Sequence, residues 1–169
     1  MKEKLQKRMT IGEYNQSVNL YADRLYRFVV KNVKDTHFAE DIVQDSYEKL
    51  WKNVARVDGE KVKTYLFTTA YHTLIDRLRK EKRMNFVEDL PAGEGSYASQ
   101  YNDVKERLHE AVGHLPEMQR IVLTLRDYEG YSYQEIGEVT GLNESLVKVY
   151  IYRARLFLKN YIGTMDVLV

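Results

Sequence analysis

The chain has 169 residues and a formal net charge of +1, so it is long enough for one medium domain or two small ones and is not a bulk polycation. It contains 0 cysteines, which excludes disulfides, thiol catalysis and cysteine-ligated zinc and suits a reducing cytoplasm. No apolar run approaches membrane-spanning length, and the opening segment MKEKLQKRM lacks the apolar middle of a signal peptide.

Three amphipathic helices are predicted in the first half of the chain, over residues 10–32, 37–53 and 62–83. The first begins with Thr10 and Glu13, which have the spacing of a capping box. With 2 prolines and 9 glycines in the whole chain, an all-α fold is the simplest prediction. The third helix has an apolar residue at every fourth position, and these residues are expected to face a core: Val62, Leu66, Ala70, Leu74 and Leu78.

Two of these helices carry charged sides. On the second, four polar residues lie three and four positions apart and therefore form one acidic patch: Asp41, Gln44, Asp45 and Glu48. Tyr47 and Trp51 fall in the apolar stripe of the same helix and are predicted to lie in the core. Residues 77–83, at the end of the third helix, hold five basic residues and one acid. Solvated helix faces remain the simplest alternative for both charged sides.

Residues 85–102 interrupt the helical pattern. This segment contains Pro91, Gly93 and Gly95 among acidic residues and is predicted to be a flexible linker. It divides the chain into a three- to four-helix domain over residues 1–84 and a four-helix domain over residues 103–169.

The second predicted domain ends in a helix-turn-helix candidate. Ser132 and Glu135 have capping-box spacing, Gly141 can take a positive φ at the turn, and Asn143 can cap the next helix. The last helix has apolar residues at helical spacing and basic residues elsewhere, and its tail over residues 163–169 is expected to fray. By itself this pattern also fits an ordinary helical hairpin with solvated cations.

No pattern indicates catalysis or a bound cofactor. His37, His72, His109 and His114 have no companion residues with metal-site spacing, and the sequence lacks a glycine-rich phosphate loop and a nucleophile motif. The chain is therefore expected to be neither an enzyme nor a metalloprotein.

Two separate segments together resemble one family. FAEDIVQDSYEKLW (38–51) followed by residues 62–83, and then LPEMQRIVLTLRDYEGYSYQEIGEVTGLNESLVKVYIYRARLFL (115–158), resemble in order and spacing the extracytoplasmic-function (group IV) sigma factors of bacterial RNA polymerase. The resemblance implies two helical domains, regions 2 and 4, and no catalytic site. It implies binding to core RNA polymerase, to the minus-ten element as it melts, to the minus-thirty-five element as duplex, and to an anti-sigma factor.

The same resemblance assigns roles by position. It places polymerase docking on Asp41, Gln44, Asp45 and Glu48. It places minus-ten contacts on Lys63, Tyr65, Thr68, His72, Arg79, Lys80 and Arg83, with a base pocket in the loop over residues 53–61. It places minus-thirty-five contacts on Ser145, Lys148, Val149, Tyr152 and Arg153.

Several positions depart from the family pattern or leave alternatives open. His72 stands where the family commonly has asparagine, and Val149-Tyr150 stands where it usually has Ser-Arg, so the promoter sequence cannot be carried over. Tyr65, where the family often has tryptophan, can stack on a base or pack inside the domain. Asp76 is expected to pair with Arg79 or Lys80, and Arg155 fits a phosphate contact or an intradomain ion pair. The linker is either a plain tether or an acidic strand that enters the polymerase.

Two other classes of protein fit parts of the sequence. A free-standing helix-turn-helix regulator would need neither the acidic patch nor the basic third helix. A sigma-mimicking interaction module would not need DNA-facing residues such as Lys148 and Arg153.

Overall fold

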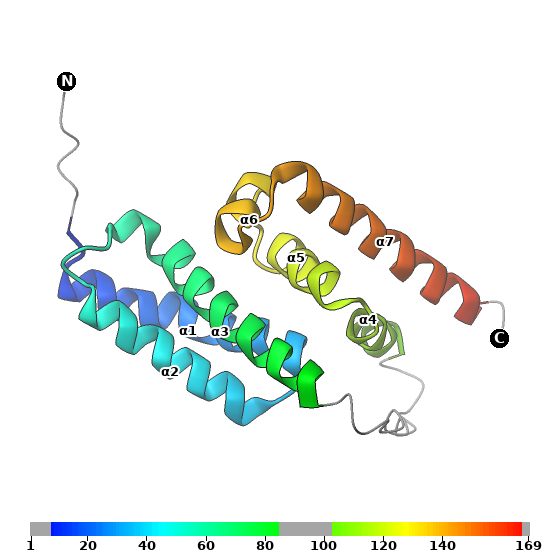
Figure 1. The fold of residues 1–169 in the computed structure, drawn as a ribbon, viewed down its shortest axis with the longest axis horizontal. Coiled ribbons are helices and arrows are strands. Elements are labelled where there is room, and N and C mark those ends of the chain that lie inside the picture. The colour runs from blue at the N-terminus through cyan, green and yellow to red at the C-terminus, as the bar shows by residue number, and fades with distance from the viewer. Residues whose placement is uncertain (1–7, 85–102, 167–169) are drawn as a thin grey trace. The chain divides into compact units, whose positions relative to one another are not determined.

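The computed structural model describes residues 8–84 and 103–166, and in this part of the chain the regular structure is helical (Figure 1). The contacts divide the chain into two compact units, one built around α1–α3 and the other around α4, α5 and α7. The predicted linker lies outside the described residues. The helical class expected from the sequence is confirmed.

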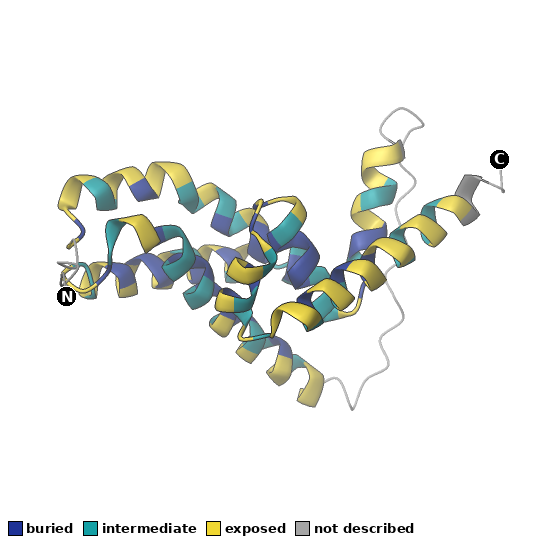
Figure 2. Ribbon diagram, turned by 90° about the horizontal axis from the view of Figure 1, so that it is seen from above, coloured by how far each residue is buried: buried dark blue, intermediate teal, exposed yellow. Residues whose placement is uncertain are grey.

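The first unit is built mainly from α1 (Ile11–Val33), α2 (Thr36–Lys52) and α3 (Val62–Met84), with the short 3-10 turn η1 (Gly59–Lys61) before α3. Figure 1 shows α1 and α2 side by side as an antiparallel pair, and contacts between them are extensive. The predicted inward stripe of α3 is buried throughout. At the centre, the rings of Phe28 and Phe67 have centroids 5.5 Å apart. Figure 2 shows buried residues along one side of the long helices and exposed residues along the other.

The start of α1 forms one half of the predicted capping box. The Glu13 amide donates to the Thr10 hydroxyl over 3.1 Å. The Glu13 carboxylate does not complete the box, because its Oε2 lies against Gly59: a Cβ built on Gly59 would be 2.0 Å from that oxygen. The side chain that was expected to cap the helix thus lies against the loop before α3.

The turn between α1 and α2 depends on two residues. Lys34 has a φ of 55°, which ends α1, and the Asp35 carboxylate then accepts the Phe38 amide over 3.0 Å at the start of α2. Arg77 of α3 donates to Asp35 over 3.1 Å, and its guanidinium lies 4.2 Å from the centroid of the Phe38 ring. This cluster joins α3 to the α1–α2 turn.

The charge of Asp35 should make stability depend on pH. The Phe38 amide, and secondarily the Arg77 guanidinium, hold the pKa of this carboxyl below its usual value of 3.8. A lowered folded pKa stabilises the protein above the unfolded pKa, and this contribution is lost as pH falls through the folded value. In urea titrations over a pH series, Asp35→Asn should be less stable than wild type at neutral pH, and the difference should shrink below pH 3.8. Asparagine keeps the cap, so an unchanged difference at all pH values would contradict a role for the charge.

The second unit is built mainly from α4 (Asp103–Gly113), α5 (Glu117–Asp127) and α7 (Glu144–Asp166), and the short helix α6 (Tyr133–Thr140) precedes α7 in the chain. Both α4 and α5 pack on α7. The buried side chains Val112, Leu115, Leu123 and Ala154 form a cluster in the core. The last helix continues to Asp166, beyond the point at which the sequence suggested fraying.

Arg120 stabilises the turn between α4 and α5 by donating hydrogen bonds to backbone carbonyls. The half-buried Arg120 donates to the carbonyls of Leu115 over 3.2 Å and Gly113 over 3.5 Å. Burial lowers the pKa of the Arg120 guanidinium from its ordinary high value. These bonds satisfy the Gly113 carbonyl at the end of α4, which has no helical partner, and the Leu115 carbonyl in the turn that follows.

Candidate functional surfaces

The predicted acidic patch lies on the outer side of α2. Its members Asp41, Gln44, Asp45 and Glu48 are all exposed, while Ile42 and Leu50 on the opposite side are buried. Glu48 is paired with Lys52 at 3.0 Å. Among the described residues, neither Asp41 nor Asp45 has a recorded ion pair or hydrogen bond through its side chain. The patch therefore presents two carboxylates that are open to a basic partner.

Trp51 is exposed, contrary to the sequence prediction. The Tyr14 ring of α1 occupies the position against α2, with its centroid 5.9 Å from Tyr47 and 5.1 Å from Trp51. Tyr47 is buried as predicted, donates to the Ser17 carbonyl over 2.7 Å, and has its pKa raised to about 12 by burial. Because Tyr14 and Tyr47 fill the space, Trp51 remains 50% exposed. Trp51 lies three residues after Glu48, so its indole is on the same side of α2 and borders the acidic patch. We call these five residues, Asp41, Gln44, Asp45, Glu48 and Trp51, the α2 surface.

The predicted minus-ten residues lie along α3 with different degrees of exposure. His72, Arg79, Lys80 and Arg83 are exposed, whereas Lys63, Tyr65 and Thr68 are half-buried. The Tyr65 hydroxyl accepts from Asn53 over 3.2 Å and lies 3.4 Å from the Lys49 carbonyl, to which it donates. Tyr65 is therefore anchored to the end of α2 by its hydroxyl. Asp76 is exposed, and within the described residues 8–84 no ion pair joins it to Arg79 or Lys80.

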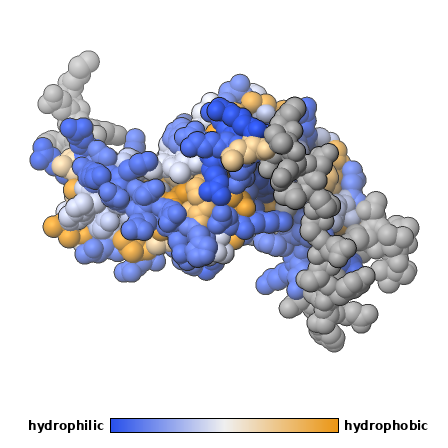
Figure 3. Space-filling model, turned by 60° about the horizontal axis from the view of Figure 1, so that its bottom comes forward, coloured by the Kyte–Doolittle hydropathy of each residue, from blue (hydrophilic) through white to orange (hydrophobic). Residues whose placement is uncertain are grey.

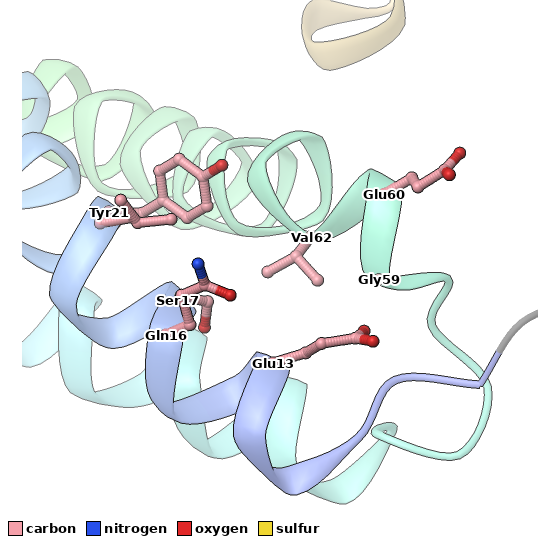
Figure 4. Close-up of a pocket in the computed structure, with 8 residues that line it drawn as sticks. Glu13, Gln16, Ser17, Tyr21, Gly59, Glu60 and Val62 are labelled. Carbon is pink, nitrogen blue, oxygen red and sulfur yellow. The ribbon is translucent and has the colours of Figure 1, made fainter.

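A hollow of about 230 Å³ lies between α1 and the beginning of α3 (Figure 4). Its walls include Glu13, Ser17, Tyr21, Gly59 and Val62. In Figure 4 the Glu13 side chain runs toward Gly59, while Glu60 points away from the hollow. From the loop over residues 53–61, Gly59 and Glu60 line this hollow, and the base pocket that the resemblance implies for the loop stays a prediction. A carboxylate in the wall makes the hollow unsuitable for a phosphate group.

The helix-turn-helix forms with the predicted local bonds. The Ser132 amide donates to the Glu135 carboxylate over 2.7 Å, and the Glu135 amide donates to the Ser132 hydroxyl over 3.1 Å. Gly141 has a φ of +76°, and the Asn143 side chain accepts the Leu146 amide over 2.8 Å. All three sequence predictions about this turn are confirmed.

Sequence reasoning missed one arginine that supports the helix-turn-helix. Arg126 donates to the Tyr131 carbonyl over 2.9 Å, and its guanidinium lies 4.7 Å from the centroid of the Tyr133 ring. Gly130, with a φ of +69°, allows the chain to turn between them. Arg126 has no spacing that distinguishes it in the sequence, because its partners become neighbours only when this turn forms.

The outer side of α7 carries the predicted duplex-facing residues. Ser145, Lys148, Val149, Tyr152 and Arg153 are all exposed, and the buried stripe of Val147, Ile151 and Ala154 faces the core. Arg155 is paired with Asp127 at 2.9 Å. Of the two alternatives for Arg155, the structure contains the intradomain ion pair.

Several negative findings apply to the described residues. In residues 8–84 and 103–166, no group of three or more His, Cys, Asp or Glu side chains could hold a metal ion. No helix in these ranges is both long and apolar enough to cross a membrane. On the face shown in Figure 3, hydrophilic side chains surround small hydrophobic patches.

Comparisons with known proteins decide the family. The model of Sigma-70 region 2 matches residues 18–84, and that of Sigma-70, region 4 matches residues 105–158. The ECF RNA polymerase sigma factor SigM of Bacillus subtilis is 32% identical over 157 residues, covering 89% of this chain and 94% of SigM. The chain belongs to the extracytoplasmic-function sigma factors. It is an alternative sigma factor, which binds core RNA polymerase and directs promoter-specific transcription initiation.

Other relatives agree with this family. The RNA polymerase sigma factor SigV of Bacillus subtilis is 35% identical over 135 residues, covering 76% of this sigma factor and 78% of SigV. The sigma factor RpoE of Bartonella quintana, solved in complex with the anti-sigma factor NepR, has a similar fold, with a TM-score of 0.74 and 24% identity over 90% of this chain and 98% of that one. CnrH, solved with the cytosolic domain of CnrY, has a TM-score of 0.65 and 21% identity over 89% and 88% of the two chains. SigM and SigV are sigma factors, which are not enzymes.

Proposed function

We propose that this sigma factor divides its work between two domains, region 2 over residues 1–84 and region 4 over residues 103–169, joined by the linker 85–102. What supports this division is that the two family models match separate segments and that the helices form two compact units. Two DNA-binding domains of modest affinity, joined by a linker, bind one promoter more tightly than either domain does alone.

Core polymerase docks on the α2 surface in this proposal. Asp41 and Asp45 are exposed and unpaired among the described residues, so they can accept charge-assisted hydrogen bonds from a basic partner surface. Trp51 adds an aromatic group to the same surface, and buried aromatic residues often dominate interface affinity. The polymerase supplies the catalytic site, and the sigma factor itself contributes no catalytic group.

The minus-ten element meets α3. Breaking base stacking costs about 1.4 kcal/mol per step, and stacking a base on an aromatic side chain returns about 1–3 kcal/mol. Capture of one or two bases therefore stabilises a bubble that the polymerase helps to open. The cations Arg79, Lys80 and Arg83 lie at the exposed end of α3 and bind phosphates. His72 is the exposed ring on this helix, and Tyr65, held by its hydroxyl, supports the helix from its half-buried position.

The minus-thirty-five element meets α7 as duplex. The outward residues Ser145, Lys148, Val149, Tyr152 and Arg153 enter the major groove, as the second helix of a helix-turn-helix does. The guanidinium of Arg153, with no recorded partner among the described residues, can bind guanine through two hydrogen bonds.

The proposal includes regulation by an anti-sigma factor and action in the cytoplasm. Two relatives of the same fold were solved with a partner, an anti-sigma factor for RpoE and the cytosolic domain of CnrY for CnrH. We expect an anti-sigma factor to hold this protein inactive by covering the surfaces described above. Since its target is the bacterial polymerase, the protein acts in the cytoplasm.

Run-off transcription tests the function as a whole. Core polymerase with this protein should start transcripts on genomic DNA at sites that core polymerase alone does not use. A free-standing regulator or an interaction module would give no new start sites, and that result would overturn the proposal.

Arg153→Ala tests the role of region 4. Loss of a bidentate contact to guanine should cost about 1–3 kcal/mol, or roughly 5- to 150-fold in promoter affinity. Protection of the minus-thirty-five segment in a footprint should weaken, while binding to core polymerase stays unchanged. Arg155→Ala is a matched control, because Arg155 pairs with Asp127 inside the unit. Equal footprints for wild type and Arg153→Ala would remove Arg153 from the interface.

A further inference from the structure

The centre of the outer side of α7 is apolar. Val149 lies two residues after Val147 and two before Ile151, both buried, so it points about 160–200° away from the core at 100° per residue. It is 40% exposed, and Tyr152 and Leu156 on the same side are 68% and 45% exposed. A helix side with this many apolar groups in solvent is an unusual surface for a soluble protein.

Charged groups on either side of this stripe indicate its occupant. Residues 144–161 contain four basic residues and one acid, a net charge of +3. The Lys148 ammonium is engaged by Glu144 at 3.6 Å and lies 5.6 Å from the centroid of the Tyr133 ring. Arg153 has no recorded partner among the described residues. An apolar centre with cations on both sides is complementary to the floor and the phosphate walls of a DNA major groove.

Hydrogen-bond chemistry then restricts what Val149 can recognise. Its side chain has neither a donor nor an acceptor, so it can distinguish bases only by apolar contact. In the major groove thymine is the one base with a methyl group, at C5. We infer that Val149 recognises the 5-methyl group of a thymine in the minus-thirty-five element, beside a guanine bound by Arg153. This inference rests on the proposed role of α7.

The spacing of the two residues predicts the spacing of the two bases. Val149 and Arg153 are four residues apart, which is about 6 Å along the helix. Successive base pairs are about 3.4 Å apart. The thymine and the guanine should therefore lie one or two base pairs from each other.

A modified base tests the inference with the complete holoenzyme. First, a promoter library with a randomised minus-thirty-five segment, transcribed by core polymerase and the full-length protein, gives the preferred sequence. Each thymine in it is then replaced by deoxyuridine, which removes only the methyl group. At one position, one or two base pairs from a guanine, the substitution should weaken promoter binding about fourfold, because the burial of one methyl group against the protein is lost.

Variants of Val149 test whether this residue contacts the methyl group. With Val149→Ala the deoxyuridine effect at that position should disappear, because the partner of the methyl group has gone. With Val149→Ile it should remain. Leu156→Ala is the matched control on the same side: it lies about 10 Å further along the helix, so the effect should persist.

The outcomes separate this inference from the proposed role of α7. An undiminished deoxyuridine effect in Val149→Ala, or a preferred sequence without thymine near the guanine, would overturn the assignment of Val149 while leaving Arg153→Ala defective. If Arg153→Ala instead keeps wild-type promoter binding and a wild-type footprint, the role of α7 itself is overturned, and the inference about the methyl group falls with it.

Discussion

Replacing both Asp41 and Asp45 with arginine is expected to abolish binding of core RNA polymerase. Both carboxylates are exposed and belong to the α2 surface, so the double reversal puts two cations against a partner surface that we expect to be basic. Like charges facing each other in an interface cost several kcal/mol, which corresponds to at least a hundredfold loss of affinity. Pull-down of core polymerase, followed by titration with a fluorescently labelled sigma factor, measures the change.

The fold should survive this double substitution, because neither side chain supports the core. Circular dichroism and the melting temperature should match those of wild type. Glu106→Arg combined with Glu110→Arg is a matched control that reverses two exposed acids, also four positions apart on one helix, outside the α2 surface. If the Asp41 and Asp45 variant binds polymerase as tightly as this control does, α2 is not the docking element.

Phe28→Ala is expected to unfold the first unit at physiological temperature. Phe28 is 2% exposed and its ring packs on Phe67 at a centroid distance of 5.5 Å. Removing a buried phenylalanine typically costs about 3–5 kcal/mol, which is a large part of the roughly 5–15 kcal/mol that stabilises a small domain. Transcription should be lost as well, because this unit carries the proposed docking surface for polymerase.

Calorimetry of this variant also tests the division into two domains. We expect two thermal transitions in the wild type and a lower temperature for one of them in Phe28→Ala, with the other unchanged. Ile11→Ala is the control, since Ile11 is 64% exposed on α1 and its truncation should shift neither transition appreciably. A single transition that moves as a whole in Phe28→Ala would show that the two units unfold together.

The sequence predicted those features that depend on neighbouring residues. The helix starts at Ser132 and Asn143 each depend on a bond to a residue three positions later, and the turn between them depends on Gly141 alone, so local sequence was enough to locate them. The inward stripe of α3 was equally predictable, because a period of 3.6 residues determines which side of a helix is buried.

Features that depend on contacts between distant residues were not predictable in this way. Trp51 has the spacing of a core residue, but Tyr14 occupies the space it would have filled. The bond between Arg77 and Asp35 joins residues 42 positions apart. The Glu13 carboxylate does not cap α1, because it lies in the space left by Gly59, which has no side chain and is 46 residues further along the chain.

The candidate surfaces were only partly predictable for the same reason. Periodicity placed the acidic side of α2 and the basic side of α7 correctly, because both lie on single helices. It could not say which charged groups already have partners. Lys148 and Arg155 are engaged by nearby acids, whereas Asp41, Asp45 and Arg153 have no recorded partner among the described residues.

The exposure of Trp51 has a practical consequence. The chain contains a single tryptophan, and this indole lies at the edge of the α2 surface with half of its area in water. Its fluorescence therefore comes from one known place on the molecule and responds to the polarity of that place. Any partner that covers α2 will exclude water from the indole and move its emission toward the blue, so the protein carries its own optical reporter of occupancy.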